Sequence, residues 1–275
     1  MTEYKTGRYT IEEDTYIIAN HAKMNGSAIA EHLGRSHGGV RGRAHILGLK
    51  KGHKKYSCDE SYFETIDNSK KAYIFGFWLA DGCVHNEGNA WRWDIAQHIK
   101  DEYILEQIRQ EVKYTGPLTR NGAKGRRLKV SSKKMCSDLI ALGGGQRKSV
   151  VCPFPTSVPA ELMSHFVRGY FDGDGSMSIS RRKRAGGTYY TYLSYTICGG
   201  EPMLEGIKET ILQQTGVELP IHWREHSQKG EHRFGLLRTS SNKAEAVAKW
   251  MYQMDEDDIF LRRKHDKYAT ITEAK

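Results

Sequence analysis

The sequence predicts an α+β protein in which two αββαββα repeats follow one another and a small all-helical unit precedes them. An apolar helical segment ending in Asp-Gly occurs twice, as Ala72–Gly82 and Phe166–Gly175. Two β-type segments, an amphipathic helix, a basic hairpin and a final helix follow each copy. Residues 8–52 instead carry the caps and apolar spacing of three short helices. We therefore expect three parts, with bounds 1–56, 57–152 and 153–275.

The N-terminal part begins with a helix signal. Thr10 is the expected N-cap and Glu13, three residues on, completes a capping box. A second helix is expected over 27–34 and a third over 36–47, each followed or closed by glycine. Lys50–Lys55 is the expected basic tether to the rest of the chain.

The sequence pattern of these helices resembles that of the helix-turn-helix units of Myb-like and phage regulator proteins. It comprises Ile29-Ala30, Leu33-Gly-Arg-Ser36, Arg43-Ala44 and Leu47-Gly-Leu49. The resemblance implies that the third helix enters a major groove. Four residues would then lie near bases or phosphates: Arg35, His37, Arg41 and Arg43. A three-helix bundle used for protein contact is the alternative.

In each repeat the later elements occur at matching places. The clearer strands are expected over 91–98 and 189–197, the amphipathic helices over 102–112 and 202–215, the last hairpin strands over 128–134 and 237–243, and the final helices over 135–142 and 244–251. These pairs share the same order and similar spacing. The two repeats therefore predict a pseudo-twofold arrangement.

The charge distribution indicates a polyanionic partner. The chain carries 42 basic and 33 acidic residues, a net charge of +9. Residues 116–135 and 176–200 contain no acid, and they occupy matching places in the two repeats. This pattern favours nucleic acid over a merely solvated surface.

No segment is long and apolar enough for a membrane span, and the N-terminus lacks a signal-peptide core. We expect a soluble, cytoplasmic protein of a phage or bacterium, without a membrane partner. The five cysteines are scattered and form no Cys-x-x-Cys pair, so a disulfide framework or a cysteine zinc site is not indicated.

The repeated Asp-Gly places an acid where a helix disfavours it. Asp81 and Asp174 lie in the last helical turn, where the helix dipole is negative. A divalent cation is the simplest partner that makes this placement favourable. The following residues, Gly82 and Gly175, are expected to close each helix in the left-handed conformation.

Small residues on the same helices predict how the two copies meet. Gly76 and Ala80 in the first copy, and Gly169 and Gly173 in the second, are four apart and share one helical face. Two such faces can pack backbone to backbone. The two aspartates would then emerge side by side.

The repeated motif resembles that of the LAGLIDADG homing endonucleases of the monomeric, two-motif kind. The likeness covers roughly residues 57–270 and includes Phe166–Ser176, Arg147-Lys148-Ser149 and Phe260–Lys264. In the first copy Leu79 replaces the usual first acid of the motif. The family implies site-specific cleavage of double-stranded DNA by a monomer whose two four-stranded sheets form a DNA-binding saddle. Two strands of ~10 residues end to end would span about 20 base pairs.

The resemblance also implies roles for individual residues. Asp81 and Asp174 would hold Mg²⁺ or Mn²⁺, which activates water and stabilises the leaving oxygen. Gln97 matches a glutamine that orders water at the site, and the second repeat has no glutamine at this place. Lys129 and Arg238 resemble the central basic residues that neutralise developing charge. Plain phosphate contacts are the equal alternative for these two.

Strand alternation and the basic segments predict further DNA-binding residues. They are Arg92, Asp94, Arg120, Arg126, Arg127, Ser178, Ser180, Arg182, Arg184, Tyr190 and Tyr192. The pattern His222-Trp-Arg-Glu-His226 spells H-x-x-E-H, which binds zinc only on a helix. Pro220 before it favours a strand, on which His222, Arg224 and His226 would share a DNA-facing side.

A non-cleaving nucleic-acid-binding protein is the alternative function. It would be a maturase acting on intron RNA, or a helix-turn-helix regulator with inactive repeats. The presence of both Asp81 and Asp174 favours cleavage.

Overall fold

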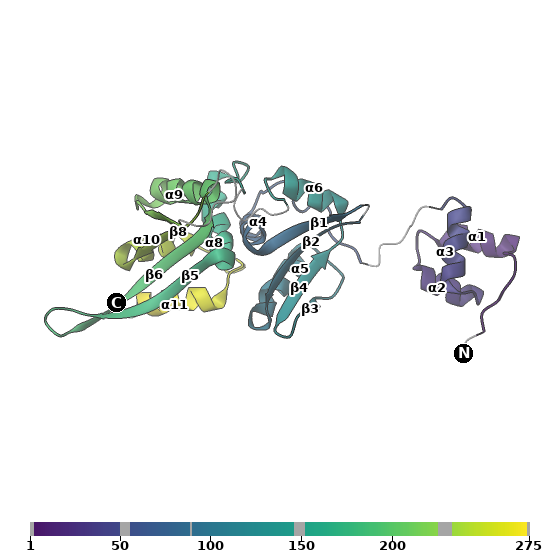
Figure 1. Cartoon of the computed structure of the whole chain (residues 1–275), viewed down its shortest axis with the longest axis horizontal. Helices are drawn as coiled ribbons and strands as arrows, with labels where there is room; N and C mark the ends of the chain where they lie inside the picture. The colour runs from purple at the N-terminus through teal and green to yellow at the C-terminus, as the bar shows by residue number, and fades with distance from the viewer. Residues whose placement is uncertain (1–2, 50–55, 89, 146–151, 225–232, 274–275) are drawn as a thin grey trace. The chain divides into compact units, whose positions relative to one another are not determined.

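The computed structural model describes residues 3–49, 56–88, 90–145, 152–224 and 233–273. The expected tether Lys50–Lys55, the phrase Arg147–Ser149 and the candidate His226 lie outside these ranges. The chain divides into two compact units, Met1–Ser57 and Cys58–Lys275 (Figure 1). Among the described helices, none is long and apolar enough to cross a membrane.

The N-terminal unit is a bundle of α1 (Ile11–Asn20), α2 (Gly26–Leu33) and α3 (His37–Ile46) around Ile17, Ile29 and Val40. Its capping box is confirmed, because the Thr10 hydroxyl accepts from the Glu13 N–H and the Glu13 carboxylate accepts from the Thr10 N–H. Gly34 closes α2 with φ +64°, a conformation that favours glycine.

The second unit contains the order αββαββα twice, as the sequence predicts. The first repeat comprises α4 (Ser69–Asp81), β1 (Gly82–Glu87), β2 (Ala90–His98), α5 (Glu102–Glu111), β3 (Thr119–Asn121), β4 (Gly125–Val130) and α6 (Lys133–Ala141). The second comprises α8 (Met163–Asp174), β5 (Gly175–Lys183), β6 (Tyr189–Gly200), α9 (Glu201–Thr215), β7 (Ile221–Trp223), β8 (Phe234–Ser240) and α10 (Ser241–Met251). A helix that the sequence analysis did not predict, α11 (Arg262–Glu273), follows.

Each repeat folds into an antiparallel four-stranded sheet, ordered β1-β2-β4-β3 and β5-β6-β8-β7. The helices cover the face of each sheet that carries buried side chains such as Trp93, Ile95 and Leu128 in the first repeat, and Tyr195 and Ile197 in the second. The alternate residues lie on the opposite face, which we call the open face. The hairpin strands β4 and β8 end earlier than expected, at Val130 and Ser240, because Ser132 and Ser240 become the N-caps of the helices that follow.

Helices α4 and α8 lie side by side (Figure 1), and they pack backbone to backbone at their glycines. A Cβ atom added at Gly76 would collide with the carbonyl oxygen of Phe166, and one added at Gly169 with that of Tyr73. Tyr73 and Phe166 are equivalent positions, because each lies eight residues before the aspartate of its own repeat. The helix contact is therefore pseudo-twofold symmetric, and the expected packing of the small-residue faces is confirmed.

The glycines that follow the two aspartates correct one expectation. Gly82 has φ −89° and Gly175 has φ −102°, so both are extended and neither is left-handed. Space is the reason for glycine here, because a Cβ at Gly82 would collide with the Trp78 ring and one at Gly175 with the Phe171 ring.

We expect Gly169→Ala to destabilise the second unit by about 2 kcal/mol or more, because its Cβ has no room against the α4 backbone. Gly145→Ala is the matched control, since a Cβ there meets nothing within 4 Å. Denaturant unfolding of the full chain measures both. Equal stability of the Gly169→Ala and Gly145→Ala proteins would contradict the backbone contact.

Candidate active site at the ends of the paired helices

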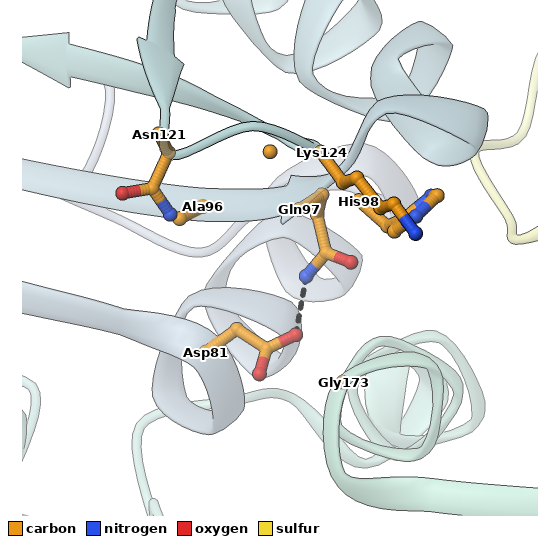
Figure 2. A pocket seen from close by; sticks show the side chains of 8 residues that line it. Asp81, Ala96, Gln97, His98, Asn121, Lys124 and Gly173 are labelled. Atoms are coloured by element: carbon orange, nitrogen blue, oxygen red, sulfur yellow. Dashed lines mark hydrogen bonds between the residues drawn. The ribbon is translucent and has the colours of Figure 1, made fainter.

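The C-terminus of α4 presents Asp81 to a side chain of the neighbouring sheet. Gln97 lies on the helix-covered side of β2, and its amide N–H donates to the Asp81 carboxylate (Figure 2). A pocket of about 500 Å³ opens here. Its lining includes Asp81, Gln97, His98, Asn121, Lys124 and Gly173. Because Gly173 belongs to α8, both repeats contribute to this pocket.

The second aspartate adjoins the same place. A Cβ added at Gly173 would lie 3.3 Å from Oδ2 of Asp81, and Asp174 is the next residue along α8. Asp81 is exposed and Asp174 is half-buried. The expected convergence of the two motif ends is therefore observed.

The other acid of the second motif, Asp172, is structural. It is buried, and it accepts hydrogen bonds from the Tyr73 hydroxyl at 2.8 Å and from the Leu261 N–H at 2.7 Å. Burial raises the pKa of Asp172 to about 6, although Lys264 opposes this shift. The equivalent position in the first repeat is Leu79, which is also buried and carries no carboxylate. Neither position therefore contributes a carboxylate to the pocket.

Lys264 lies next to the candidate site, at the C-terminus of α8, and it is not among the site residues predicted from the sequence. Its ammonium donates to the carbonyl oxygens of Phe171, Asp172 and Gly175 at 2.6–2.8 Å, so it caps the C-terminus of α8. Burial lowers the pKa of Lys264 to about 8, while the carboxylates of Asp172, Asp81 and Asp174 favour its charged form. Its place in the phrase Phe260–Lys264 is the sequence signal that points to it.

Strand register makes the two repeats comparable residue by residue. Gly82 pairs with Ile95 in the first sheet, and Gly175 pairs with Ile197 in the second. Two residues further on, Gly199 stands where the first repeat has Gln97. The repeats are therefore chemically unequal beside their aspartates.

The same register aligns the two candidate basic residues. Lys129 pairs with Asp94, and Arg238 pairs with Thr196, the position equivalent to Asp94. Both basic side chains are exposed on the open faces. The strand pleat separates Lys129 from Gln97, which lies on the helix-covered side.

The open face of the first sheet carries three of the candidate DNA-binding residues, Arg92, Asp94 and Arg127. Asp94 is largely covered there, because its carboxylate lies 3.2 Å from His85 Nε2 and 3.7 Å from an Arg127 nitrogen. Arg120 and Arg126 alternate onto the helix-covered side, where Arg126 pairs with Glu102 at 3.0 Å. The structure therefore removes Arg120 and Arg126 from the predicted DNA-facing surface.

The open face of the second sheet brings together most of the DNA-binding residues predicted for the second repeat. Register pairs Ser178 with Ser194, Ser180 with Tyr192, and Arg182 with Tyr190. The guanidinium of Arg184 lies 5.2 Å from the Tyr190 ring centroid. His222 lies on strand β7 and Arg224 follows it, as the sequence predicts, so a helical zinc motif does not form at 221–223.

The N-terminal unit requires a correction. Arg35 is buried, and its guanidinium bonds the Glu13 carboxylate and the carbonyl oxygens of Lys5, Gly7 and Arg8. It therefore holds the bundle together and does not face DNA.

The other candidates of the third helix differ in exposure. Arg43 is half-buried and forms a two-point ion pair with Asp14. His37 and Arg41 are exposed on α3.

Comparison with known proteins supports the fold. Residues 161–250 match the model of a LAGLIDADG-like domain. The chain is similar to the I-LtrWI LAGLIDADG homing endonuclease bound to target DNA, with 12% identity, coverage of 78% of this chain and 90% of that chain, and a TM-score of 0.51. Meganuclease I-SmaMI bound to uncleaveable DNA is also 12% identical, with 74% and 90% covered and a TM-score of 0.49.

No curated protein sequence matches the chain. The chain thus contains a LAGLIDADG-like domain and has the fold of a LAGLIDADG homing endonuclease.

Proposed function

We propose that this protein is a site-specific endonuclease that cuts both strands of duplex DNA with a divalent metal ion. The observation that carries the proposal is the glycine contact of α4 and α8, which sets Asp81 beside Gly173, the residue before Asp174. Two carboxylates at two helix C-termini form a concentrated negative site. The open faces beside it carry basic and aromatic side chains suited to a polyanion.

The donor set suits Mg²⁺ or Mn²⁺. Within the described ranges no three His, Cys, Asp or Glu residues form a metal-binding group. Mg²⁺ is commonly held by one or two carboxylates together with substrate phosphates and water. Asp81 and Asp174 would therefore supply enough protein ligands. When bound, the ion lowers the pKa of water and stabilises charge on the leaving oxygen.

Other residues of the chain would orient the metal-binding carboxylates and neutralise the charge of the DNA phosphates. Gln97 donates to Asp81 and fixes the orientation of its carboxylate. Lys129 and Arg238 place positive charge on the open faces, where they would contact phosphates near the scissile bonds. Tyr190, Tyr192 and Arg182 extend the second open face along the duplex.

Cleavage of a randomised duplex library in Mg²⁺, followed by sequencing of the cut ends, tests this function. We expect both strands to be cut at one long, related set of sites. Selective binding without cutting would instead support a regulator with inactive repeats. Preference for folded intron RNA would support a maturase.

Asp81→Asn and Asp174→Asn should each reduce double-strand cleavage at least about 100-fold, because each removes a metal ligand and almost no volume. DNA binding should stay within about tenfold of wild type. Asp67→Asn is the control, since Asp67 is a surface carboxylate that pairs with Lys71 near the opposite end of α4. Full cutting by either site variant would rule out the assignment.

Gln97→Ala should slow one strand about 10- to 100-fold more than the other, since it removes the group that orients Asp81. The slowed strand should be the one most affected by Asp81→Asn. End-labelled duplexes read out each strand, and Gln110→Ala, an exposed glutamine on α5, is the control. Equal slowing of both strands would assign Gln97 to general binding.

We also propose that the N-terminal unit makes an additional DNA contact through α3. Arg41→Ala should weaken binding and reduce the salt slope by about one unit, as expected for one lost phosphate contact. Arg35→Ala should instead loosen the bundle, because it leaves the buried Glu13 carboxylate without its main partner. Binding titrations and hydrogen exchange of α1–α3 separate the two effects. Unchanged binding and salt slope for Arg41→Ala would contradict this contact.

A further inference from the structure

The last turn of α8 carries Asp174, and a lysine from beyond both repeats holds the backbone on either side of it. The Lys264 ammonium donates to the carbonyl oxygens of Phe171 and Asp172, at 2.6 and 2.8 Å. It also donates to the Gly175 carbonyl oxygen, at 2.6 Å. An ammonium has three N–H donors, so all of them are used here. Lys264 therefore cannot move without breaking a bond to the turn that presents the carboxylate.

Lys264 makes these bonds in a place from which solvent is almost excluded. The residue is only 2% exposed, and its ammonium lies 4.8 Å from the centroid of the Phe171 ring. A buried ammonium loses its hydration, and this loss is costly unless hydrogen bonds replace it. The carbonyl oxygens at the negative end of α8 are the replacement. Because little water can compete for them, the three bonds hold the last turn of α8 in one conformation.

The start of α11 also ties Lys264 to the first repeat. The guanidinium of the neighbouring Arg263 pairs with the Asp101 carboxylate at 2.9 Å. The Arg262 N–H donates to the Tyr103 hydroxyl at 2.7 Å. Asp101 directly precedes α5, and Tyr103 lies in the first turn of that helix. Lys264 thus connects the end of α8 to the repeat that carries the first aspartate.

We propose that Lys264 is the positioning residue of Asp174. Its three hydrogen bonds fix the last turn of α8, and they thereby fix the direction in which the Asp174 carboxylate leaves the helix. This inference rests on the proposed nuclease function, in which Asp174 binds metal. Lys264 lies beyond residues 161–250, so the second motif depends on a part of the chain outside the matched LAGLIDADG-like domain.

A simple counter-charge is the alternative role for Lys264, and the two roles predict opposite changes in metal affinity. A positive charge close to a carboxylate site repels an incoming cation. Removing a mere counter-charge would therefore strengthen Mn²⁺ binding. Removing a positioning residue would weaken Mn²⁺ binding, because the carboxylate would no longer be held in one orientation.

Mn²⁺ titration of the full chain without DNA, followed by electron paramagnetic resonance, separates these roles. An Asp81→Asn background confines the measurement to the Asp174 site. Lys264→Met should weaken Mn²⁺ binding about tenfold. Lys264→Arg should also weaken it, because a planar guanidinium keeps the charge but not the geometry of an ammonium. Lys267→Met is the matched control and should bind as the background does, because Lys267 donates from the same helix to the Met177 carbonyl oxygen of β5 and not to α8.

Each variant is titrated well below its own unfolding transition, so that general destabilisation does not enter the comparison. Lys264→Arg carries the test if Lys264→Met does not fold. Unchanged or tighter Mn²⁺ binding by either variant in its folded state would overturn the positioning role.

Hydrogen exchange provides a readout that needs neither metal nor DNA. The Gly175 N–H donates to the Phe171 carbonyl oxygen, which is one of the three that Lys264 holds. Lys264→Met should speed exchange of this amide at least about tenfold, and Lys267→Met should leave it unchanged. Equal exchange in wild type and Lys264→Met would overturn the role of Lys264, whereas a wild-type chain that cuts no DNA would overturn only the nuclease proposal.

Discussion

The close approach of the α4 and α8 backbones is the constraint on which the candidate site depends. Gly76 and Gly169 each face a carbonyl oxygen of the other helix, and no larger residue fits at either position. Ordinary helix pairs stand about 8–10 Å apart, a distance set by the side chains between them. Removing those side chains lets the two helix ends, and hence Asp81 and Gly173, meet in one place.

The close approach of α4 and α8 concentrates negative charge at their C-terminal ends. Two features of the fold limit this charge. Lys264 donates to three carbonyl oxygens at the end of α8, which satisfies part of that helix terminus from within the protein. Asp172 turns inward to Tyr73 and Leu261, so it adds no charge to the pocket. The carboxylates of Asp81 and Asp174 remain at the two helix ends. They would bind a divalent ion, and DNA phosphates would complete the coordination of that ion.

Features carried by neighbouring residues are predictable from the sequence, whereas those made by the tertiary fold are not. The capping box at Thr10 and the glycine spacing of the two motif helices are local, and the structure confirms both. The conformation predicted for Gly82 is wrong, because the Trp78 ring and not the backbone angle requires glycine there. The DNA contact predicted for Arg35 is wrong because the loop carbonyls that bury it meet only in the folded unit. That Gly199 is the equivalent of Gln97 emerges only from the strand register.

Anomalous diffraction from crystals of the chain grown with Mn²⁺ and a selected duplex would show directly whether Asp81 and Asp174 hold metal ions at the DNA. We expect manganese peaks within coordination distance of the Asp81 and Asp174 carboxylates, at the C-terminal ends of α4 and α8 and against the DNA backbone. Manganese bound elsewhere, with the two aspartates remote from the DNA phosphates, would contradict this expectation.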